Sequence, residues 1–273
     1  MQNTVYTTLL TRLAAEPFFL SAERLPWLAS MTAEPQAAQW GLETHLSADG
    51  AERPYQLAGE VAVVSGMGTL MKRVGSWYDV DYAALESAVR SASEDPASRA
   101  VVLNLCSPGG GVIGCAETAA RLVEIREQTG KPQIMVIDYM ACSAAYYIAA
   151  HMDIVATPSA YVGSIGTIMI REEIHRALAA MGVDFTVYKS GRLKDMSYPL
   201  RQSTEEETAL MQAEVDDCGA QFREWVTSHR PDVAEETMQG QCFSGQEGLA
   251  LGLVDALAND LSDAIAQVAE KLA

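Results

Sequence analysis

The chain has 273 residues, 49% of them hydrophobic and 20% charged, which suits one substantial core and excludes a disordered polyelectrolyte. Its formal net charge of −17 repels phosphate backbones and anionic lipid headgroups, which argues against binding to nucleic acids or membrane surfaces. The five cysteines form an odd set without a C-x-x-C pair, so we expect a reducing compartment, packed free thiols and no metal site.

Residues 1–55 are interrupted by Pro17, Pro26, Pro35 and Pro54, which prevent any long element. We interpret residues 1–55 as an N-terminal arm and residues 56–273 as one compact domain. The first twenty residues lack the basic start, apolar block and small-residue cleavage site of a secretory signal. No apolar run reaches the ~18–20 residues of a transmembrane helix. We therefore expect a protein that stays in the cytoplasm without a membrane anchor.

From residue 60 onward, short apolar runs alternate with helical patterns, which is typical of a parallel α/β sheet. Tyr82, Leu85 and Val89 recur on one face of a predicted helix that ends before Pro96. The other predicted elements are strands at 60–66, 100–105, 134–138, 153–156 and 184–189, and helices at 113–127, from about 142, and at 172–182. We expect one α/β domain of repeated β-α units with an N-terminal extension.

The C-terminal third of the chain is predicted to be mostly helical. Ser203 and Glu206 have the spacing of a capping box that starts a long helix. The apolar residues of this helix recur at helical spacing and are Met211, Val215, Cys218, Phe222 and Val226. A last helix is predicted at about 260–272.

Three strand-to-helix junctions are rich in small residues, and ligands of open α/β sheets bind at such junctions. The first is Ser-Pro-Gly-Gly-Gly at 107–111, which can present unblocked N–H groups to an oxyanion or a phosphate equally well. It lacks the Lys-Ser/Thr of a P-loop and the spacing of a dinucleotide fingerprint. A tight turn without a ligand explains the motif on its own just as well.

The second junction places Ser143 at the start of a helix. A serine there is more often an N-cap than a nucleophile, but Ala141, Ala144 and Ala145 leave room for a substrate chain to reach its hydroxyl. Cys142 is the rival nucleophile. A reactive thiolate needs a cationic or histidine partner, and the sequence offers no specific candidate, so we expect Cys142 to be buried in packing.

A serine nucleophile needs a base, and none of the four histidines fits well. His151 lies about 12 Å from Ser143 along the same helix, at ~1.5 Å per residue. His45 and His229 are expected in solvent, and His175 lies in a charged segment and remains the runner-up. The other possible base is a lysine whose pKa burial lowers toward neutrality.

Two lysines, Lys189 and Lys194, follow a predicted strand. Most lysines are solvated surface charges. Glycine and proline around Lys194 nevertheless indicate a shaped loop rather than a charged helix face. The third small-residue junction, at 161–167, offers Ser164 to hydrogen-bond such an amine.

Five motifs in order resemble the signal peptide peptidase A family of serine peptidases, and among its members the lambda-type phage head maturation proteases. They are SPGGG at 107–111, ACSAAYY at 141–147, GSIGT at 163–167, SGRLKD at 190–195 and FSGQEGLALGLVDAL at 243–257. The match runs from about residue 59 to residue 257. It implies a Clp/crotonase-like fold and a Ser-Lys dyad that uses no metal or other cofactor.

Carried over motif by motif, the resemblance makes Ser143 the nucleophile and Lys194 the general base. It also implies that Ser164 orients the lysine amine, and that the backbone N–H of Gly110, with that of Gly109, forms the oxyanion hole. Lys189 lies outside the matching position.

The residues next to this dyad lead to two further expectations. Asp195 would raise the pKa of the neighbouring lysine if it faced the amine, so we expect its carboxylate to point elsewhere. Many relatives have glycines where this chain has Ala144 and Ala145, and Cys142 precedes the serine. These small substitutions bear on specificity more than on activity.

The resemblance and the expected absence of an anchor favour a serine endopeptidase that trims phage scaffold, portal or other head proteins in the host cytoplasm or within the procapsid. Its relatives imply a homo-oligomer. Because the chain ends soon after the motif at 243–257, any scaffold is expected to be a separate protein.

Three alternatives remain open from the sequence. The first is a non-catalytic capsid-assembly or interaction protein that keeps the fold and uses its acidic surface and arm for contacts. The second is a bacterial cytoplasmic peptidase that resembles the signal peptide peptidases. The third is a crotonase-type acyl-CoA enzyme, which would leave the serine and the lysine unexplained.

Overall fold

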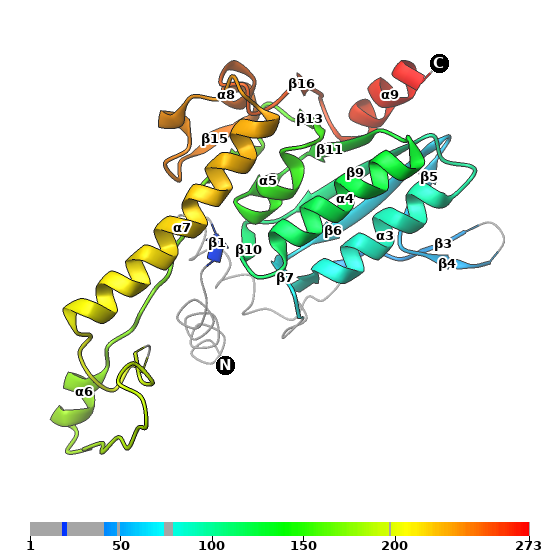
Figure 1. Ribbon diagram of the computed structural model, residues 1–273. Helices are drawn as coiled ribbons and strands as arrows, with labels where there is room; N and C mark the ends of the chain where they lie inside the picture. Colours follow the sequence, from blue (N-terminus) through cyan, green and yellow to red (C-terminus); the bar gives the residue numbers. More distant parts are fainter. Residues whose placement is uncertain (1–17, 21–40, 48–49, 74–78, 197, 273) are drawn as a thin grey trace.

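A seven-stranded sheet forms the centre of the computed structural model, which describes residues 18–20, 41–47, 50–73, 79–196 and 198–272 (Figure 1). Its strand order is β16-β13-β11-β9-β6-β2, with β5 also paired to β6. The parallel strands are β6 (Val61–Met67), β9 (Ala100–Cys106), β11 (Gln133–Ile137), β13 (Asp153–Ala156) and β16 (Ala256–Leu257). The prediction of an α/β domain with parallel crossovers is confirmed.

Part of the segment interpreted as an arm adds strands to this domain. β2 (Gly41–Leu42) and β5 (Gln56–Ala58) pair antiparallel with β6, and β3 (His45–Leu46) pairs with β4 (Glu52–Arg53). The amphipathic stretch near the start of the arm and three of its four prolines, at 17, 26 and 35, lie outside the described residues.

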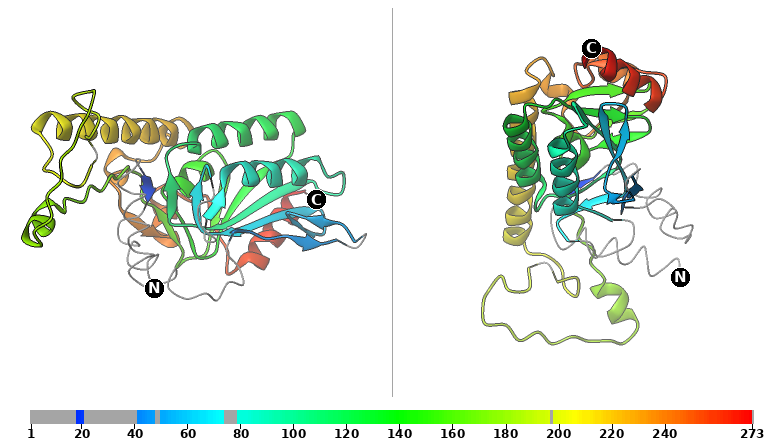
Figure 2. Two further views of the ribbon diagram at one scale, coloured as in Figure 1. Left: turned by 90° about the horizontal axis from the view of Figure 1, so that it is seen from below. Right: turned by 90° about the vertical axis from the view of Figure 1, so that its right-hand side faces the viewer.

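The central strands are buried on both faces, because successive side chains alternate between two core layers. Val61, Val63 and Val102 pack under α9 (Leu261–Leu272) on one face. Ala62, Val64 and the other alternate residues face α3 (Tyr82–Glu94) and α4 (Cys115–Thr129) on the opposite face. The two views in Figure 2 show the sheet between these helices.

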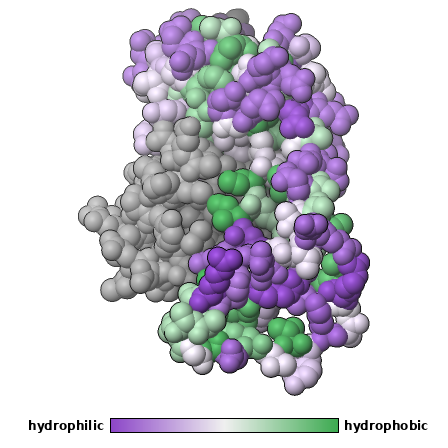
Figure 3. Space-filling model, turned by 90° about the vertical axis from the view of Figure 1, so that its left-hand side faces the viewer, coloured by the Kyte–Doolittle hydropathy of each residue, from purple (hydrophilic) through white to green (hydrophobic). Residues whose placement is uncertain are grey.

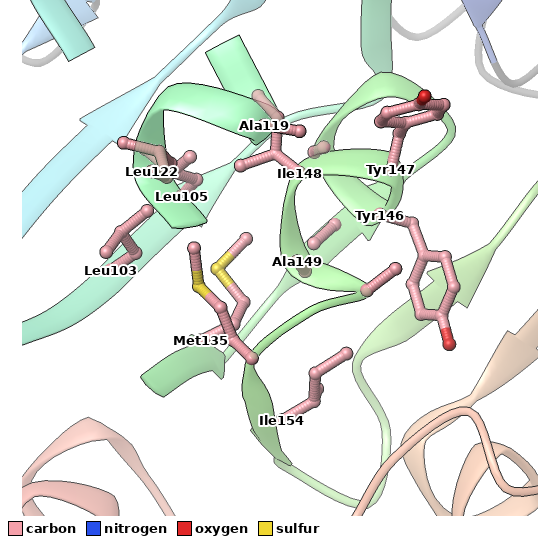
Figure 4. Packing of buried hydrophobic residues seen from close by; sticks show 14 of the residues in the cluster. Leu103, Leu105, Ala119, Leu122, Met135, Tyr146, Tyr147, Ile148, Ala149 and Ile154 are labelled. Carbon is pink, nitrogen blue, oxygen red and sulfur yellow. The ribbon is translucent and has the colours of Figure 1, made fainter. Parts of the chain in front are cut away.

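The larger core layer extends to α5 (Ala144–Ala149), every residue of which is buried. In Figure 4, Leu103 and Met135 of the sheet lie beside Leu122 of α4 and Ile148 of α5. This packing fixes α5, and with it the turn that precedes α5, to the rigid centre of the molecule.

Two smaller sheets stand at the carboxyl ends of the central strands. One has the order β12-β14-β15, formed by Met140–Cys142, Tyr161–Gly163 and Cys242–Ser244. The other has the order β1-β10-β7-β8, formed by Phe18–Leu20, Gly109–Gly111, Thr69–Met71 and Asp79–Asp81. The last strand of the first sheet leads into the short helix α8 (Gly245–Ala250).

The long helix α7 (Glu205–His229) reaches away from the sheets and carries a distal lobe, residues 168–204, at its far end (Figures 1 and 2). The lobe contains one short helix, α6 (His175–Ala180), which is shorter than the predicted 172–182. The predicted strand at 184–189 was wrong, because these residues are exposed and have no neighbouring strand to pair with. Throughout the described ranges, no helix has both the length and the apolar character needed to cross a bilayer.

Candidate active site

Ser143 occupies the sharp turn between β12 and α5. It has a φ of 55° and a ψ of −117°, a backbone conformation that is uncommon for a residue with a side chain and costs of order 1–3 kcal/mol. The turn is held by two bonds: the Ser143 N–H donates to Gly163 O at 2.8 Å, and the Tyr147 N–H donates to Ser143 O at 2.8 Å. The side chain is fully buried, and its Oγ has no hydrogen-bond partner among the described residues. The turn therefore holds a hydroxyl that its own fold does not use.

Ser164 lies beside Ser143 because the two serines follow paired residues of neighbouring strands. β12 and β14 run parallel with Cys142 opposite Gly163, so the chain leaves both strands at the same level, roughly 4.8 Å apart. Ser164 also has a positive φ, 52°, and its N–H donates to Gln241 O at 2.6 Å. The structure thus brings the predicted nucleophile and the predicted lysine-orienting serine together.

The glycine turn lies on the other side of Ser143. Ser107 forms a bridge with Ala141, and the Cys142 N–H donates to Ser107 O at 3.0 Å. Beyond this bridge β10 begins, with Gly109 at a φ of 121°. A Cβ at Gly110 would lie 1.9 Å from Leu70 O of β7, so only glycine permits this approach. The backbone amides expected to form an oxyanion hole are therefore next to the serine turn.

Lys194, the predicted base, lies elsewhere. It is exposed in the distal lobe, where it lines a pocket formed by residues 185–200 without any residue from the serine turn. Its neighbour Asp195 is bonded to Arg201, and Arg201 is paired with Glu207 in the first turn of α7. These contacts tie the lysine to the outer end of α7.

The serine turn is tied to the inner end of the same helix. Trp225 stacks on Tyr147 with ring centroids 5.4 Å apart, and the Trp225 indole N–H donates to Tyr147 O at 2.8 Å. Between Glu207 and Trp225, α7 rises by about 27 Å at ~1.5 Å per residue. Within one chain, the structure does not bring Lys194 to Ser143.

The carboxylate of Asp195 binds Arg201 and Lys189, in line with the expectation that it does not face Lys194. The carboxylate accepts from Arg201 at 2.8 Å and from Lys189 at 2.5 Å. The hydrogen bonds from Arg201, and then those from Lys189, hold the pKa of this carboxyl well below its usual range. The nearest carboxylate in the sequence is thus committed to other partners.

The rival nucleophile Cys142 is fully buried, as expected of a packing residue. Its Sγ lies 3.9 Å from that of Cys242. Both cysteines are paired with Gly163, from the two strands that flank it. Both are thiols that are not joined in a disulfide, and they lie on the same face of this small sheet because each is opposite Gly163.

The histidines do not approach the serine turn either. His151 lies beyond the far end of α5, where its Nε2 is 3.3 Å from Gln133 Oε1. Burial, with Arg126 and His229 nearby, lowers the pKa of His151 to about 3. Nowhere in the described part of the chain do three or more His, Cys, Asp or Glu side chains gather as potential metal ligands.

One neighbour of the site could not be found from the sequence. Phe18–Leu20 forms strand β1 and pairs antiparallel with the glycine strand β10. The segment follows Pro17 and is only three residues long, so neither its periodicity nor its composition predicts a strand.

Comparison with known proteins gives one family. The model of "Peptidase family S49" matches residues 125–273, which is more than half of the chain. "Head-tail preconnector protein GP5" of Enterobacteria phage P21 is 30% identical over 274 residues, covering 94% of this chain and 54% of that protein. "Capsid assembly protease C" of Escherichia phage lambda is 28% identical over 253 residues, covering 89% and 56%.

Relatives from cellular organisms are similar over shorter stretches. "Protease 4" of Salmonella typhi is 31% identical over 221 residues, covering 80% of this chain and 35% of that protein. The chain spans between about a third and about 60% of the length of the curated relatives it matches. Among solved structures, an enoyl-CoA hydratase from Bacillus halodurans is 13% identical with a TM-score of 0.46, covering 80% of this chain and 77% of that one.

Proposed function

This chain belongs to peptidase family S49, and we propose that it is a serine endopeptidase whose dyad consists of Ser143 and Lys194. The observation that carries the proposal is the serine turn. A strained, buried serine with an unused hydroxyl lies between Ser164 and the amides of Gly109 and Gly110. Strain of this kind is found where a side chain must be held in a set position for chemistry.

The proposed reaction is hydrolysis of a peptide bond in two steps. The neutral lysine amine takes the proton from Ser143 Oγ as the oxygen attacks the scissile carbonyl carbon. The N–H of Gly110, joined by that of Gly109 once it leaves Ser107 Oγ, stabilises the oxyanion, and the lysine then gives its proton to the leaving amine. Water attacks the resulting ester in the same way and releases the acid. Ser164 orients the amine throughout.

We propose that the lysine comes from a second copy of the chain. Contacts of the lysine segment and of the serine turn with α7 lie about 27 Å apart along this helix, so a dyad within one copy would require the lobe to move. The lobe also exposes large hydrophobic side chains, and such patches mark interaction surfaces. They are Met181, Val183, Phe185, Val187, Tyr188 and Tyr198. Figure 3 views the side of the molecule that is on the left in Figure 1, and hydrophobic side chains gather at its lower end.

As substrates we propose scaffold, portal or other head proteins of a phage. The support is the similarity over most of this chain to proteins named as a head-tail preconnector and as a capsid assembly protease. We propose that residues 56–273 form the peptidase domain and residues 1–55 an arm whose strand β2 is added to the sheet of that domain.

The test is cleavage of candidate head proteins by the purified chain, read by mass spectrometry. Ser143→Ala and Lys194→Ala should each lower kcat/KM at least about a thousandfold, as removal of a nucleophile or its base does elsewhere. The matched control is Cys142→Ala, which keeps the hydroxyl and should retain activity. Equal activity of the Ser143→Ala variant and the wild-type chain would end the proposal.

A second candidate function is a non-catalytic assembly protein that retains the fold. It is favoured by the same separation of Lys194 from Ser143. A serine-directed fluorophosphonate separates the two candidates, because only an activated serine is labelled. Labelling that is lost in Ser143→Ala supports the peptidase, and unlabelled wild-type protein supports the assembly role.

A further inference from the structure

The arm places a strand on the glycine edge of the site. β1 pairs antiparallel with β10, with Phe18 opposite Gly111, Phe19 opposite Gly110 and Leu20 opposite Gly109. The other edge of β10 is taken by β7, through Gly110 and Leu70. Both edges of the glycine strand are thus occupied among the described strands. Figure 1 shows β1 next to β10.

An endopeptidase must hold its substrate in an extended form at the bond to be cut. The backbone of an extended chain binds most directly by adding a strand to a sheet edge. On β10, the edge away from β7 is the one that remains for such a chain, and it adjoins the serine turn. That edge is where β1 lies.

The direction of β1 fits the path of a substrate. Antiparallel pairing brings Leu20 opposite Gly109, the first residue of β10 after the bridge between Ser107 and Ala141. The end of the segment therefore points toward the serine turn, while its start lies farther along β10. A substrate whose acyl part is held on β10 must run the same way to present its next carbonyl to Ser143.

We infer that Phe18–Leu20 occupies the substrate-binding edge of β10, and that a polypeptide substrate binds only after it displaces this segment. The inference rests on the proposed peptidase function. It makes the arm an intramolecular competitor. Because β1 belongs to the same chain, it competes at an effective concentration that can reach the order of millimolar, so a substrate must bind this edge more strongly than a three-residue strand does.

The test removes the pairing while keeping the full chain. Successive N–H groups along a strand point to opposite sides, so one of the two at positions 18 and 19 must face β10. The double variant Phe18→Pro/Phe19→Pro therefore loses a bond to β10 whichever residue donates it. The matched control is Glu23→Pro/Arg24→Pro, which places two prolines in the arm outside β1.

Two measurements are made. Hydrogen exchange of the peptide that contains Gly109–Gly111 is followed in the Ser143→Ala background, where no turnover occurs. It should be faster in the double variant than in the control. In the active chain, the KM for an external polypeptide should fall roughly fivefold to tenfold with kcat unchanged.

The outcomes separate the inference from the proposed function. Unchanged exchange and unchanged KM in the double variant overturn the inference while cleavage of the external polypeptide continues. An equal change in the control also overturns it, because the effect would then not come from β1. Absence of cleavage in every active-background variant overturns the proposed function, and exchange alone then decides whether the arm occupies β10.

Discussion

Two serines with positive φ lie side by side at the ends of β12 and β14, and the glycine turn closes in from the other side. Each position has either a positive φ or a backbone contact too close for a side chain, and most residues tolerate neither. Gly110 is the tightest, since its Cα faces the carbonyl oxygen of Leu70. The positions of these groups are therefore set by the backbone conformation rather than by contacts of their side chains.

This close approach predicts that Gly110→Ala destabilises the protein. The added Cβ would lie 1.9 Å from Leu70 O and force β10 and β7 apart, which should cost about 3 kcal/mol in the free energy of unfolding. Gly166→Ala is the matched control, because its nearest atom is 3.7 Å away. It should change stability by less than about 0.5 kcal/mol. Urea denaturation measures both, and equal effects would contradict the prediction.

His151 gives a second prediction, on the pH dependence of stability. Its folded-state pKa is lowered to about 3, mainly by burial, while an unfolded histidine titrates near 6.5. Below pH 6.5 the unfolded chain binds a proton that the folded chain does not, so stability falls as pH falls from 6.5 toward 3. The titration of His151 alone should make the free energy of unfolding roughly 2 kcal/mol lower at pH 5 than at pH 7.

The His151→Gln variant should lose less stability than the wild type between pH 7 and pH 5, because glutamine does not titrate. His229→Gln is the control, since His229 is exposed and its removal should leave most of the pH dependence in place. Urea denaturation at both pH values decides the matter. Parallel pH profiles of His151→Gln and the wild type would contradict the assignment.

The long helix α7 shows what could be predicted from local sequence. Apolar residues at helical spacing predicted this helix. The pattern exists because one face of the helix, with Phe222 and Val226, packs into the core. The cap was predicted one residue early. Ser203 donates its hydroxyl to Glu173 instead, and the capping box is made by Thr204 and Glu207. Because Ser203 and Thr204 are followed by three glutamates, either residue could form a capping box. Only the fold shows that Ser203 is bonded to Glu173 and that Thr204 is the cap.

The lobe shows where local sequence was insufficient. Phe185 and Val187 alternate with polar residues as in a strand, but a strand needs a neighbour, and the lobe lies away from every sheet. The serine, the glycines and Ser164 could be predicted to meet, because the ends of parallel strands meet at one edge. The place of Lys194 depends on how α7 projects, which no local pattern encodes.

Ion pairs at the base of the lobe predict its response to acid. Hydrogen bonds from Arg201 lower the pKa of Glu207 to about 2. The same guanidinium also lowers the pKa of Asp195. A lowered folded-state pKa means that the stabilisation is complete above about pH 4.5 and is lost as pH falls toward 2. The lobe should therefore loosen in this range.

Pepsin digestion at pH 4.5 and pH 2.5 measures the loosening. Cuts within residues 185–203 should increase at the lower pH in the wild type and appear at both values in Arg201→Met. Arg192→Met is the control, because the pair of Arg192 and Glu206 is exposed. A wild-type lobe that is cut equally at both values would contradict the role given to Arg201.

For the molecule as a whole, the separation of Ser143 from Lys194 predicts complementation. A mixture of Ser143→Ala and Lys194→Ala chains, each inactive alone, should recover activity if each site takes its lysine from another copy. Random pairing of equal amounts restores about a quarter of the sites. Ser143→Ala mixed with Ser143→Ala/Lys194→Ala should remain inactive, because neither chain supplies the serine. Failure to recover activity in co-assembled chains would exclude a shared dyad.

The 25 residues of α7 then have a consequence for when the enzyme works. If the proposed dyad is shared between copies, a single molecule would hold the nucleophile near one end of the helix and the base near the other, and would not cleave other proteins. Its specific activity would then rise with protein concentration.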